Sequence, residues 1–312
     1  MKETILKKRS AWLSHSRGDR IFLAVVYGIV ILVAFVCVYP VYFTVIASFS
    51  DAYEVYSGKT FLLPKGFNIM SYELVFQNKD IWIGYANTIL YTVLGTLLNI
   101  SLTIPAAYAL SRPNMLGQGI LMKIFLVTMY FGGGMIPTYL LYNSLGLLNT
   151  RTILVLVGGV SVYNVIVSRT FFQNNIPESL LEAARIDGAN EFYIFARIVL
   201  PLSGAIVAVM TLYYAVGHWN SYFSAMIYTR DTDIQPLQLV LRRILLQNTT
   251  ALSSAYEAGM SDEALAAQER KAYLALTMKF ALVFISSAPM LIIYPFVQKY
   301  FVKGVMIGSI KG

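Results

Sequence analysis

Residues 177–190 combine acidic, basic and small side chains in one short segment between two long apolar stretches. Pro177 suits the first turn of a helix, and Gly188 suits the position just after its C-terminal end. The segment therefore predicts a short helix with one apolar stripe, made of Leu180, Leu181 and Ala184. Glu182 and Arg185 lie off that stripe. The small alanines of the helix would let a second surface approach closely, and the Glu182 carboxylate could pair with a basic partner. The same pattern also fits a connecting helix packed on its own bundle.

Other groups capable of chemistry are sparse in the sequence. There is no G-x-x-x-x-G-K-[ST] motif, which excludes nucleotide binding through a P-loop. Cys37 is the single cysteine, which excludes an intrachain disulfide and a cysteine zinc cluster. His15 and His218 are far apart in the chain, and no Ser/His/Asp arrangement accompanies them. We therefore expect no catalytic residue, no metal and no cofactor in this chain.

Apolar helices must position residues 177–190. Of the 312 residues, 57% are hydrophobic and only 13% are charged, whereas a soluble domain carries about 25% charged residues. Stretches without any charge, such as 21–50 and 81–111, are long enough to cross a bilayer as helices. We predict an all-α integral membrane protein with six transmembrane helices at 21–49, 85–110, 121–143, 152–173, 194–217 and 275–297.

The distribution of positive charge predicts the topology. With the N-terminus inside, 14 of the 24 Lys and Arg residues fall in cytoplasmic segments or near the cytoplasmic ends of the spans, and 4 fall in the two shorter outer loops. This asymmetry predicts both termini in the cytoplasm, and it makes the net charge of +8 a membrane signal rather than a nucleic-acid signal. The predicted organisation is a basic N-terminus at 1–20, a transmembrane domain at 21–297 and a cytoplasmic tail at 298–312.

Several shorter signals modify this outline. Gly132-Gly133-Gly134 interrupts the third predicted span and Pro201 lies in the fifth, as expected of kinked packing or of a cavity or hinge. Apolar residues at three- and four-residue spacing predict an amphipathic helix at 235–248. Ser261 predicts the start of a helix that runs into the last span. No acidic residue lies inside a proposed span, which argues against an ion-coupled carrier.

The order Glu182-Ala183-Ala184, then Asp187-Gly188-Ala189, then Phe195, Ile198 and Leu200-Pro201 resembles the EAA motif of ABC importer permease subunits. The resemblance implies that 177–190 contains the coupling helix, which docks in a cleft of the ATP-binding subunit. Glu182 would then pair with a basic residue of the ATPase, and Gly188 would allow the turn after the helix. The implied docking residues are Glu182, Ala183, Ala184, Arg185, Asp187, Gly188 and Ala189.

Two further segments extend the resemblance over nearly the whole chain. The tail 298–312 is similar to the C-terminus of MalG-like permeases, which serve carbohydrates, and the likeness implies contact with the ATPase through Lys303, Gly304, Gly308 and Lys311. A basic end attracted to anionic lipid is the alternative. Residues 133–139 and 145–150 resemble a subgroup similar to the LplC and YtcP types, which are linked to complex oligosaccharides.

The resemblance implies a permease subunit of an ATP-binding-cassette importer that takes up an oligosaccharide by alternating access in a prokaryotic inner (plasma) membrane. The implied partners are a second homologous permease subunit, two ATP-binding subunits that hold ATP and Mg, an extracellular sugar-binding protein and membrane lipid, without nucleic acid. ATP hydrolysis is expected in the separate ATPase subunits. Two alternatives stay open: the same architecture with a non-sugar cargo, and a non-transporting membrane scaffold that docks a soluble partner.

A sugar pathway would need polar side chains that replace water and aromatic faces that stack on sugar rings. The spans offer several such residues, although Tyr and Trp also gather at bilayer interfaces and pack in cores. The predicted pathway residues are Tyr130, Tyr163, Asn164, Trp219 and Asn220.

Overall fold

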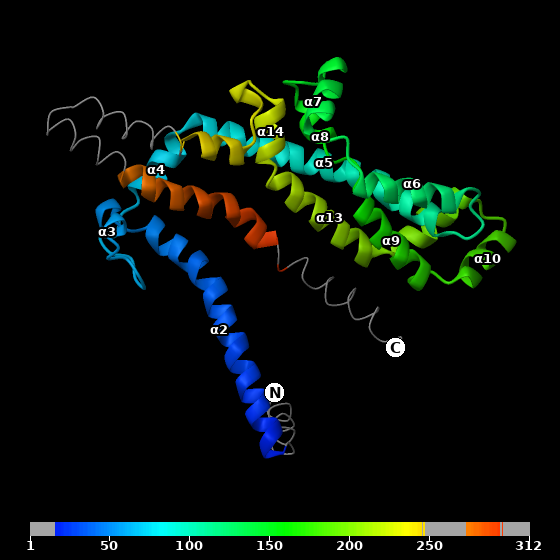
Figure 1. The fold of residues 1–312 in the computed structure, drawn as a ribbon, viewed down its shortest axis with the longest axis horizontal. Helices are drawn as coiled ribbons and strands as arrows, with labels where there is room; N and C mark the ends of the chain where they lie inside the picture. Colours follow the sequence, from blue (N-terminus) through cyan, green and yellow to red (C-terminus); the bar gives the residue numbers. More distant parts are fainter. Residues whose placement is uncertain (1–15, 245, 247–272, 294, 296–312) are drawn as a thin grey trace. The chain divides into compact units, whose positions relative to one another are not determined.

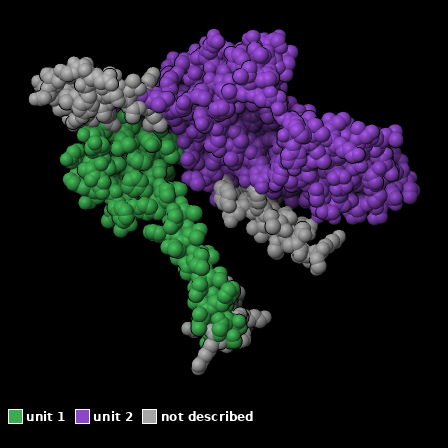
Figure 2. Space-filling model, viewed as in Figure 1, with its two compact units in different colours: residues 1–73, 260–284 green, residues 74–259, 285–312 purple. Residues whose placement is uncertain are grey.

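The computed structural model describes residues 16–244, 246, 273–293 and 295. Over these residues the regular structure is entirely helical (Figure 1), which confirms the predicted all-α class. The predicted helix start at Ser261 and the tail at 298–312 lie outside the described residues. The chain divides into two compact units, residues 1–73 with 260–284 and residues 74–259 with 285–312 (Figure 2).

The first unit is built on α2 (Arg17–Ser48), which corresponds to the predicted span at 21–49. Ser16 caps this helix, because its hydroxyl accepts the backbone N–H of Asp19 while the Asp19 carboxylate accepts the N–H of Ser16. Pro40 leaves the helix continuous, and the Thr44 hydroxyl donates to the Pro40 carbonyl. None of the most apolar 18 residues of α2 is buried, as expected of a helix that faces lipid or another subunit.

Two short helices, α3 (Ala52–Tyr56) and α4 (Met70–Gln77), follow α2. The helix Tyr273–Ile293 is also long and apolar enough to cross a membrane, and it corresponds to the last predicted span. Within the first unit, the Phe43 ring meets Phe280 edge to face, and the Ser71 hydroxyl donates to Thr277 Oγ1 at 2.8 Å. These contacts join the N-terminal part of the chain to residues near position 280.

The second unit is organised around α5 (Lys79–Ser111), which packs along α9 (Val162–Asn175) and α13 (Gly204–Trp219). α5 stays continuous through Pro105, and it covers the predicted span at 85–110. Its core consists of buried apolar side chains from these helices and from the segment that links α9 to α13. The largest fully buried members are Ile104, Val165, Phe172, Leu181, Ile194, Val199 and Met210.

The third predicted span is a bent pair of helices, α6 (Gln118–Tyr130) and α7 (Met135–Ser144), which meet at 110°. The bend coincides with the glycines at 132–134, so the predicted interruption is confirmed. Gly134 has φ +84°, a conformation that glycine adopts without the penalty paid by other residues.

The fifth predicted span is bent as well. The stretch Glu191–Leu202 meets α13 at 81°, and it contains a π-helix, η1 (Ile194–Val199). Pro201 has no N–H to donate to the carbonyl of Arg197, so the α-helical hydrogen-bond register cannot continue there. The backbone instead forms the wider turn of the π-helix η1 just before the proline.

The fourth predicted span requires a correction, because residues 152–173 do not form one continuous helix. α8 (Arg151–Leu156) ends before Gly158, whose φ is +75°, and α9 begins after Ser161, whose hydroxyl accepts the backbone N–H of Asn164. Three helices of the described chain are long enough to span a membrane alone, and two bent pairs could each form a further span. α8 and α9 together occupy the fourth predicted span, 152–173, on either side of the break.

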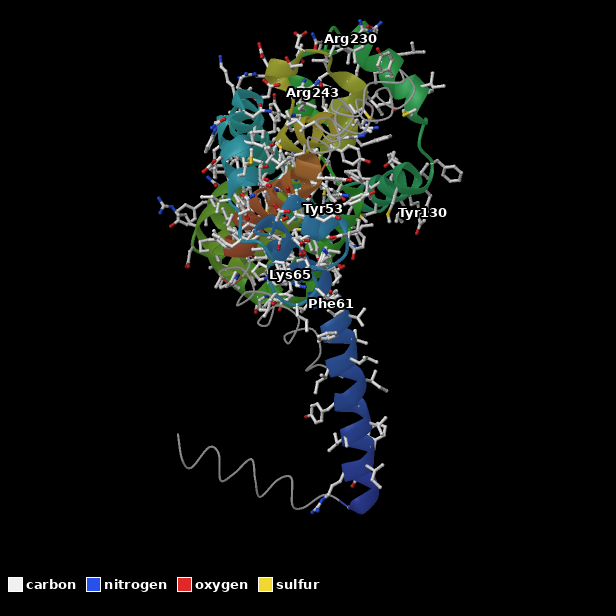
Figure 3. All side chains as sticks on the ribbon, turned by 90° about the vertical axis from the view of Figure 1, so that its left-hand side faces the viewer. Tyr53, Phe61, Lys65, Tyr130, Arg230 and Arg243 are labelled. Carbon is white, nitrogen blue, oxygen red and sulfur yellow. The ribbon has the colours of Figure 1, made fainter. Side chains whose placement is uncertain are left out.

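The segment after α13 packs back on α5. α14 (Tyr222–Tyr228) and the 3-10 helix η2 (Thr232–Ile234) lead into a helix at 237–244. Leu237, Val240 and Leu241 are buried there, which confirms the predicted amphipathic pattern. On the other face, Arg243, labelled in Figure 3, donates to the Asp80 carboxylate at 2.8 Å.

Candidate functional site

The short helix predicted within residues 177–190 is α10 (Glu178–Ile186), with Pro177 as its N-cap residue. Two of its side chains, Leu181 and Ala184, are buried in the core of the second unit. Leu180, predicted to share their stripe, is instead exposed. The remaining exposed residues follow a spacing of three and four and so lie on one side of the helix. They are Ser179, Glu182, Ala183 and Ile186, and we call them the outer face of α10.

The turn after α10 has the geometry that the sequence predicted. Gly188 has φ +81°, and its N–H donates to the carbonyl of Arg185 at 3.0 Å. The N–H of Ala189 donates to the carbonyl of Ala184, also at 3.0 Å. These bonds satisfy carbonyls that the end of the helix leaves open, as in a glycine C-cap. Asn190 then starts the next helix by accepting the backbone N–H of Tyr193 at 2.8 Å.

A hollow of about 540 Å³ lies beside this turn. It contains four of the seven predicted docking residues, Ala184, Asp187, Gly188 and Ala189, while Glu182, Ala183 and Arg185 lie on α10 outside it. The rest of its lining comes from the helix that follows: Asn190, Tyr193, Arg197 and Ile198. The small side chains keep the hollow open, so a protruding group of a partner could enter it.

A network of charged groups holds α10 in place. The Glu178 carboxylate accepts from Arg112 at 3.1 Å and from Arg185 at 3.3 Å, and Arg185 also donates to Glu191 at 2.9 Å. The carboxylates of Glu191 and Glu178 raise the pKa of the Arg185 guanidinium. Arg185 is one of the predicted docking residues, and its guanidinium pairs with Glu178 and Glu191 within the chain.

Arg112 is the residue of this network that sequence reasoning missed. It follows the last residue of α5 and is only 8% exposed. Besides Glu178, it donates to the Phe172 carbonyl at 3.1 Å and to the Ser111 hydroxyl at 2.9 Å, and its guanidinium lies over the Tyr108 ring. One side chain thus connects α5, α9 and α10. The available signal was a single arginine placed directly after the uncharged stretch 81–111.

Two large apolar side chains near this site are exposed. Ile186, on the outer face of α10, is 86% exposed, and Phe192, in α11 (Glu191–Tyr193), is 80% exposed. Exposed apolar side chains that form a patch rimmed by polar residues are typical of an interaction surface. Neither residue belonged to the predicted docking set.

The predicted pathway residues come from three different helices, α6, α9 and α13. Tyr130, labelled in Figure 3, lies at the end of α6 and is 75% exposed. Tyr163 is also exposed, whereas its neighbour Asn164 in α9 is buried. Asn220 caps α13, since its amide donates to the Val216 carbonyl at 3.0 Å.

Trp219 is a packing residue in this structure. It is buried, its indole N–H donates to the carbonyl of Ser286 at 2.9 Å, and its ring meets Tyr85 edge to face. A tryptophan whose polar atom is already satisfied inside the protein has little left to offer a passing ligand. The sequence predicts Trp219 at the outer end of a span. It does not reveal its hydrogen-bond acceptor, because Ser286 lies 67 residues further along the chain.

Comparison with known proteins identifies the family to which this architecture belongs. Residues 81–307 match the family described as binding-protein-dependent transport system inner membrane component. The chain belongs to this family. Its members are transmembrane components rather than ATPases, and the predicted EAA motif and coupling helix are features of ABC transporter permeases of this kind. The chain is therefore an ABC importer permease, and α10 carries the Glu182-Ala183-Ala184 residues of the predicted EAA motif.

Similarity to individual permeases extends over almost the full length. The chain is 38% identical over 294 residues to the polygalacturonan/rhamnogalacturonan transport system permease protein YtcP of Bacillus subtilis (strain 168), covering 94% of this chain and 99% of that one. It is 36% identical to protein LplC of the same organism, covering 89% and 90%. A solved chain of a bacterial ABC transporter involved in the import of the acidic polysaccharide alginate is 35% identical, with a TM-score of 0.80 and coverage of 92% and 99%. These findings confirm the resemblance to the LplC and YtcP types.

Proposed function

We propose that this permease imports an acidic oligosaccharide by alternating access, driven by ATP hydrolysis in partner subunits. One observation carries the proposal: similarity over nearly the whole chain to YtcP, named for polygalacturonan and rhamnogalacturonan, and to a transporter of alginate. Both names describe polymers that contain sugar carboxylates. The family resemblance of the sequence implied an oligosaccharide, and these relatives add the expectation of negative charge.

The proposed assembly contains a second homologous permease subunit, two ATP-binding subunits that hold ATP and Mg, and an extracellular sugar-binding protein. Six helices enclose only part of a pathway, so the cargo would pass between the two permeases. Both termini of this chain would lie in the cytoplasm, in accord with the positive-inside rule. Lys303, Gly304, Gly308 and Lys311, which lie outside the described residues, are proposed to contact the ATPase.

The proposed docking uses the outer face of α10 and the hollow beside it. Glu182 would pair with a basic residue of the ATPase, Ile186 would supply apolar contact area, and Gly188 would keep the turn narrow. When the ATPase subunits close on ATP, they would move α10. Because Arg112 ties Glu178 to the end of α5, that movement would be passed to the helix at the centre of the second unit.

Transport of a defined sugar tests the proposal. Proteoliposomes containing the complete complex, with ATP inside and the binding protein outside, are expected to accumulate labelled trigalacturonate. ATP hydrolysis should rise when binding protein and sugar are added together, and the vesicles without ATP serve as the control. A complex that hydrolyses ATP but accumulates no sugar would support the scaffold alternative instead. A complex that prefers a non-sugar cargo would show the architecture to be right and the cargo wrong.

A further inference from the structure

A second cavity lies inside the second unit, away from α10. Its volume is about 220 Å³, and it forms where the break between α8 and α9 meets α13 and α14. Pockets for drug-sized ligands measure about 300–1,000 Å³, so this cavity has room for a single sugar ring rather than an oligosaccharide. The lining residues are Leu154, Val157, Gly158, Tyr213, Tyr214, Gly217, His218, Ser221 and Ser224.

The helix break at this cavity is supported by a buried polar side chain. Asn99 of α5 has no exposed surface, and its amide nitrogen donates to the carbonyls of Gly158 at 2.8 Å and Gly159 at 2.9 Å. Non-helical backbone at membrane depth is tolerated where it is buried in protein or lines a cavity. A buried amide that satisfies two freed carbonyls therefore maintains an open space, which a continuous helix at 152–173 would fill.

The same amide determines which ring nitrogen of His218 carries the proton. Both donor positions of the Asn99 amide are used by the two carbonyls, so its oxygen faces His218 Nε2 at 2.7 Å. An amide oxygen only accepts, and the proton is therefore assigned to Nε2. In the neutral ring Nδ1 is then an acceptor, and no hydrogen bond to it occurs among the described residues. Gly95 makes room for this ring, because a Cβ at that position would overlap it.

The tyrosines and serines complete a lining suited to hydroxyl groups. The Tyr214 hydroxyl is held by Thr103 Oγ1 at 2.7 Å and by the N–H of Ser161 at 3.3 Å, whereas the Tyr213 ring is 47% exposed. Ser221 donates to the His218 carbonyl at 2.6 Å and keeps its lone pairs, and the Ser224 hydroxyl has no partner within the described chain. None of the lining residues is a carboxylate, a lysine or an arginine.

We propose that this cavity is a subsite for one pyranose ring of the cargo, which it recognises through ring hydroxyls and an apolar ring face rather than through a sugar carboxylate. Tyr213 offers the flat surface, while His218 and Ser224 offer the hydrogen-bonding groups. The proposal rests on the proposed import of a carbohydrate. The subsite specifies where one sugar ring of the cargo binds and which groups of that ring the cavity contacts.

Uptake by the complete complex in proteoliposomes tests the subsite, with labelled trigalacturonate and its carboxyl-reduced, neutral counterpart as probes. Tyr213→Ala and Ser224→Ala are each expected to raise the KM of both sugars about tenfold, the factor that corresponds to a lost contact of about 1.4 kcal/mol. ATP hydrolysis without sugar should stay at the wild-type rate. Tyr27→Ala, which removes an exposed tyrosine from α2, is the matched control and should leave KM unchanged.

The outcomes separate the two proposals. KM values within twofold of wild type for both variants would overturn the subsite, and so would an increase confined to the acidic sugar. A wild-type complex that takes up neither sugar would overturn the proposed function itself. Ser224→Ala removes one hydroxyl without changing the backbone, so it keeps the test valid if Tyr213→Ala fails to assemble.

Discussion

The double variant Glu182→Lys, Gly188→Pro is expected to lose uptake completely while the protein still inserts into the membrane. Glu182 lies on the outer face of α10, where lysine would repel a basic partner instead of pairing with it. Gly188 has φ +81°, whereas proline is fixed near −65°, so the turn after the helix cannot form. ATP hydrolysis in the purified complex should no longer respond to binding protein and sugar.

Separate variants distinguish docking from local unfolding. Glu182→Lys alone leaves the turn intact and should still reduce uptake at least tenfold, the effect of about 1.4 kcal/mol of lost contact energy. Glu54→Lys makes the same charge reversal on α3, where Glu54 pairs with Lys59 at 3.6 Å, and should have little effect because partly exposed ion pairs contribute about 0–1 kcal/mol. Uptake that survives the double change would disprove the docking assignment.

Arg112→Met is expected to uncouple ATP hydrolysis from uptake and to destabilise the second unit. The change removes one of the two donors to the Phe172 carbonyl, which keeps the backbone N–H of Ile176, and one of the two cations on Glu178. A hydrogen bond that involves a charged group contributes about 1.5–3 kcal/mol to stability. Thermal unfolding of the purified complex measures the stability, and the number of sugars imported per ATP hydrolysed measures the coupling.

The conservative and control variants define what Arg112 does. Arg112→Lys keeps the charge but cannot reach Glu178, Phe172 and Ser111 together, so uptake should recover only in part. Lys65→Met removes an exposed cation from the first unit (Figure 3) and should change neither measurement. If Arg112→Met retains the wild-type ratio of sugar to ATP, then the ion pair stabilises the chain without transmitting motion.

The parts of the structure that follow from local signals were predictable. The long uncharged runs predicted α2, α5 and the helix Tyr273–Ile293. Proline, an early acid and a late glycine predicted α10 and its turn. The glycines at 132–134 predicted the bend between α6 and α7. Each of these signals acts within a few residues of the element it forms, so no knowledge of tertiary contacts was required.

The parts that depend on distant contacts were not predictable from pattern alone. Arg112 and Glu178 are 66 residues apart, and Trp219 and Ser286 are 67 apart. Hydropathy predicted a continuous helix at 152–173, because two glycines barely change the apolar character of that run. The break at Gly158 persists because the Asn99 amide, on another helix, donates hydrogen bonds to the freed carbonyls of Gly158 and Gly159.

The central claim is that the outer face of α10 meets an ATP-binding subunit, and site-directed photo-cross-linking tests it most directly. Cys37 lies exposed on α2 and is first replaced by serine, so that a benzophenone label attaches only to the introduced cysteine. A label on the Ala183→Cys variant is expected to cross-link to the ATPase subunit in the assembled complex. A label on the Ser57→Cys variant, just after α3, should not. Cross-linking to the ATPase from Ser57→Cys but not from Ala183→Cys would contradict the account.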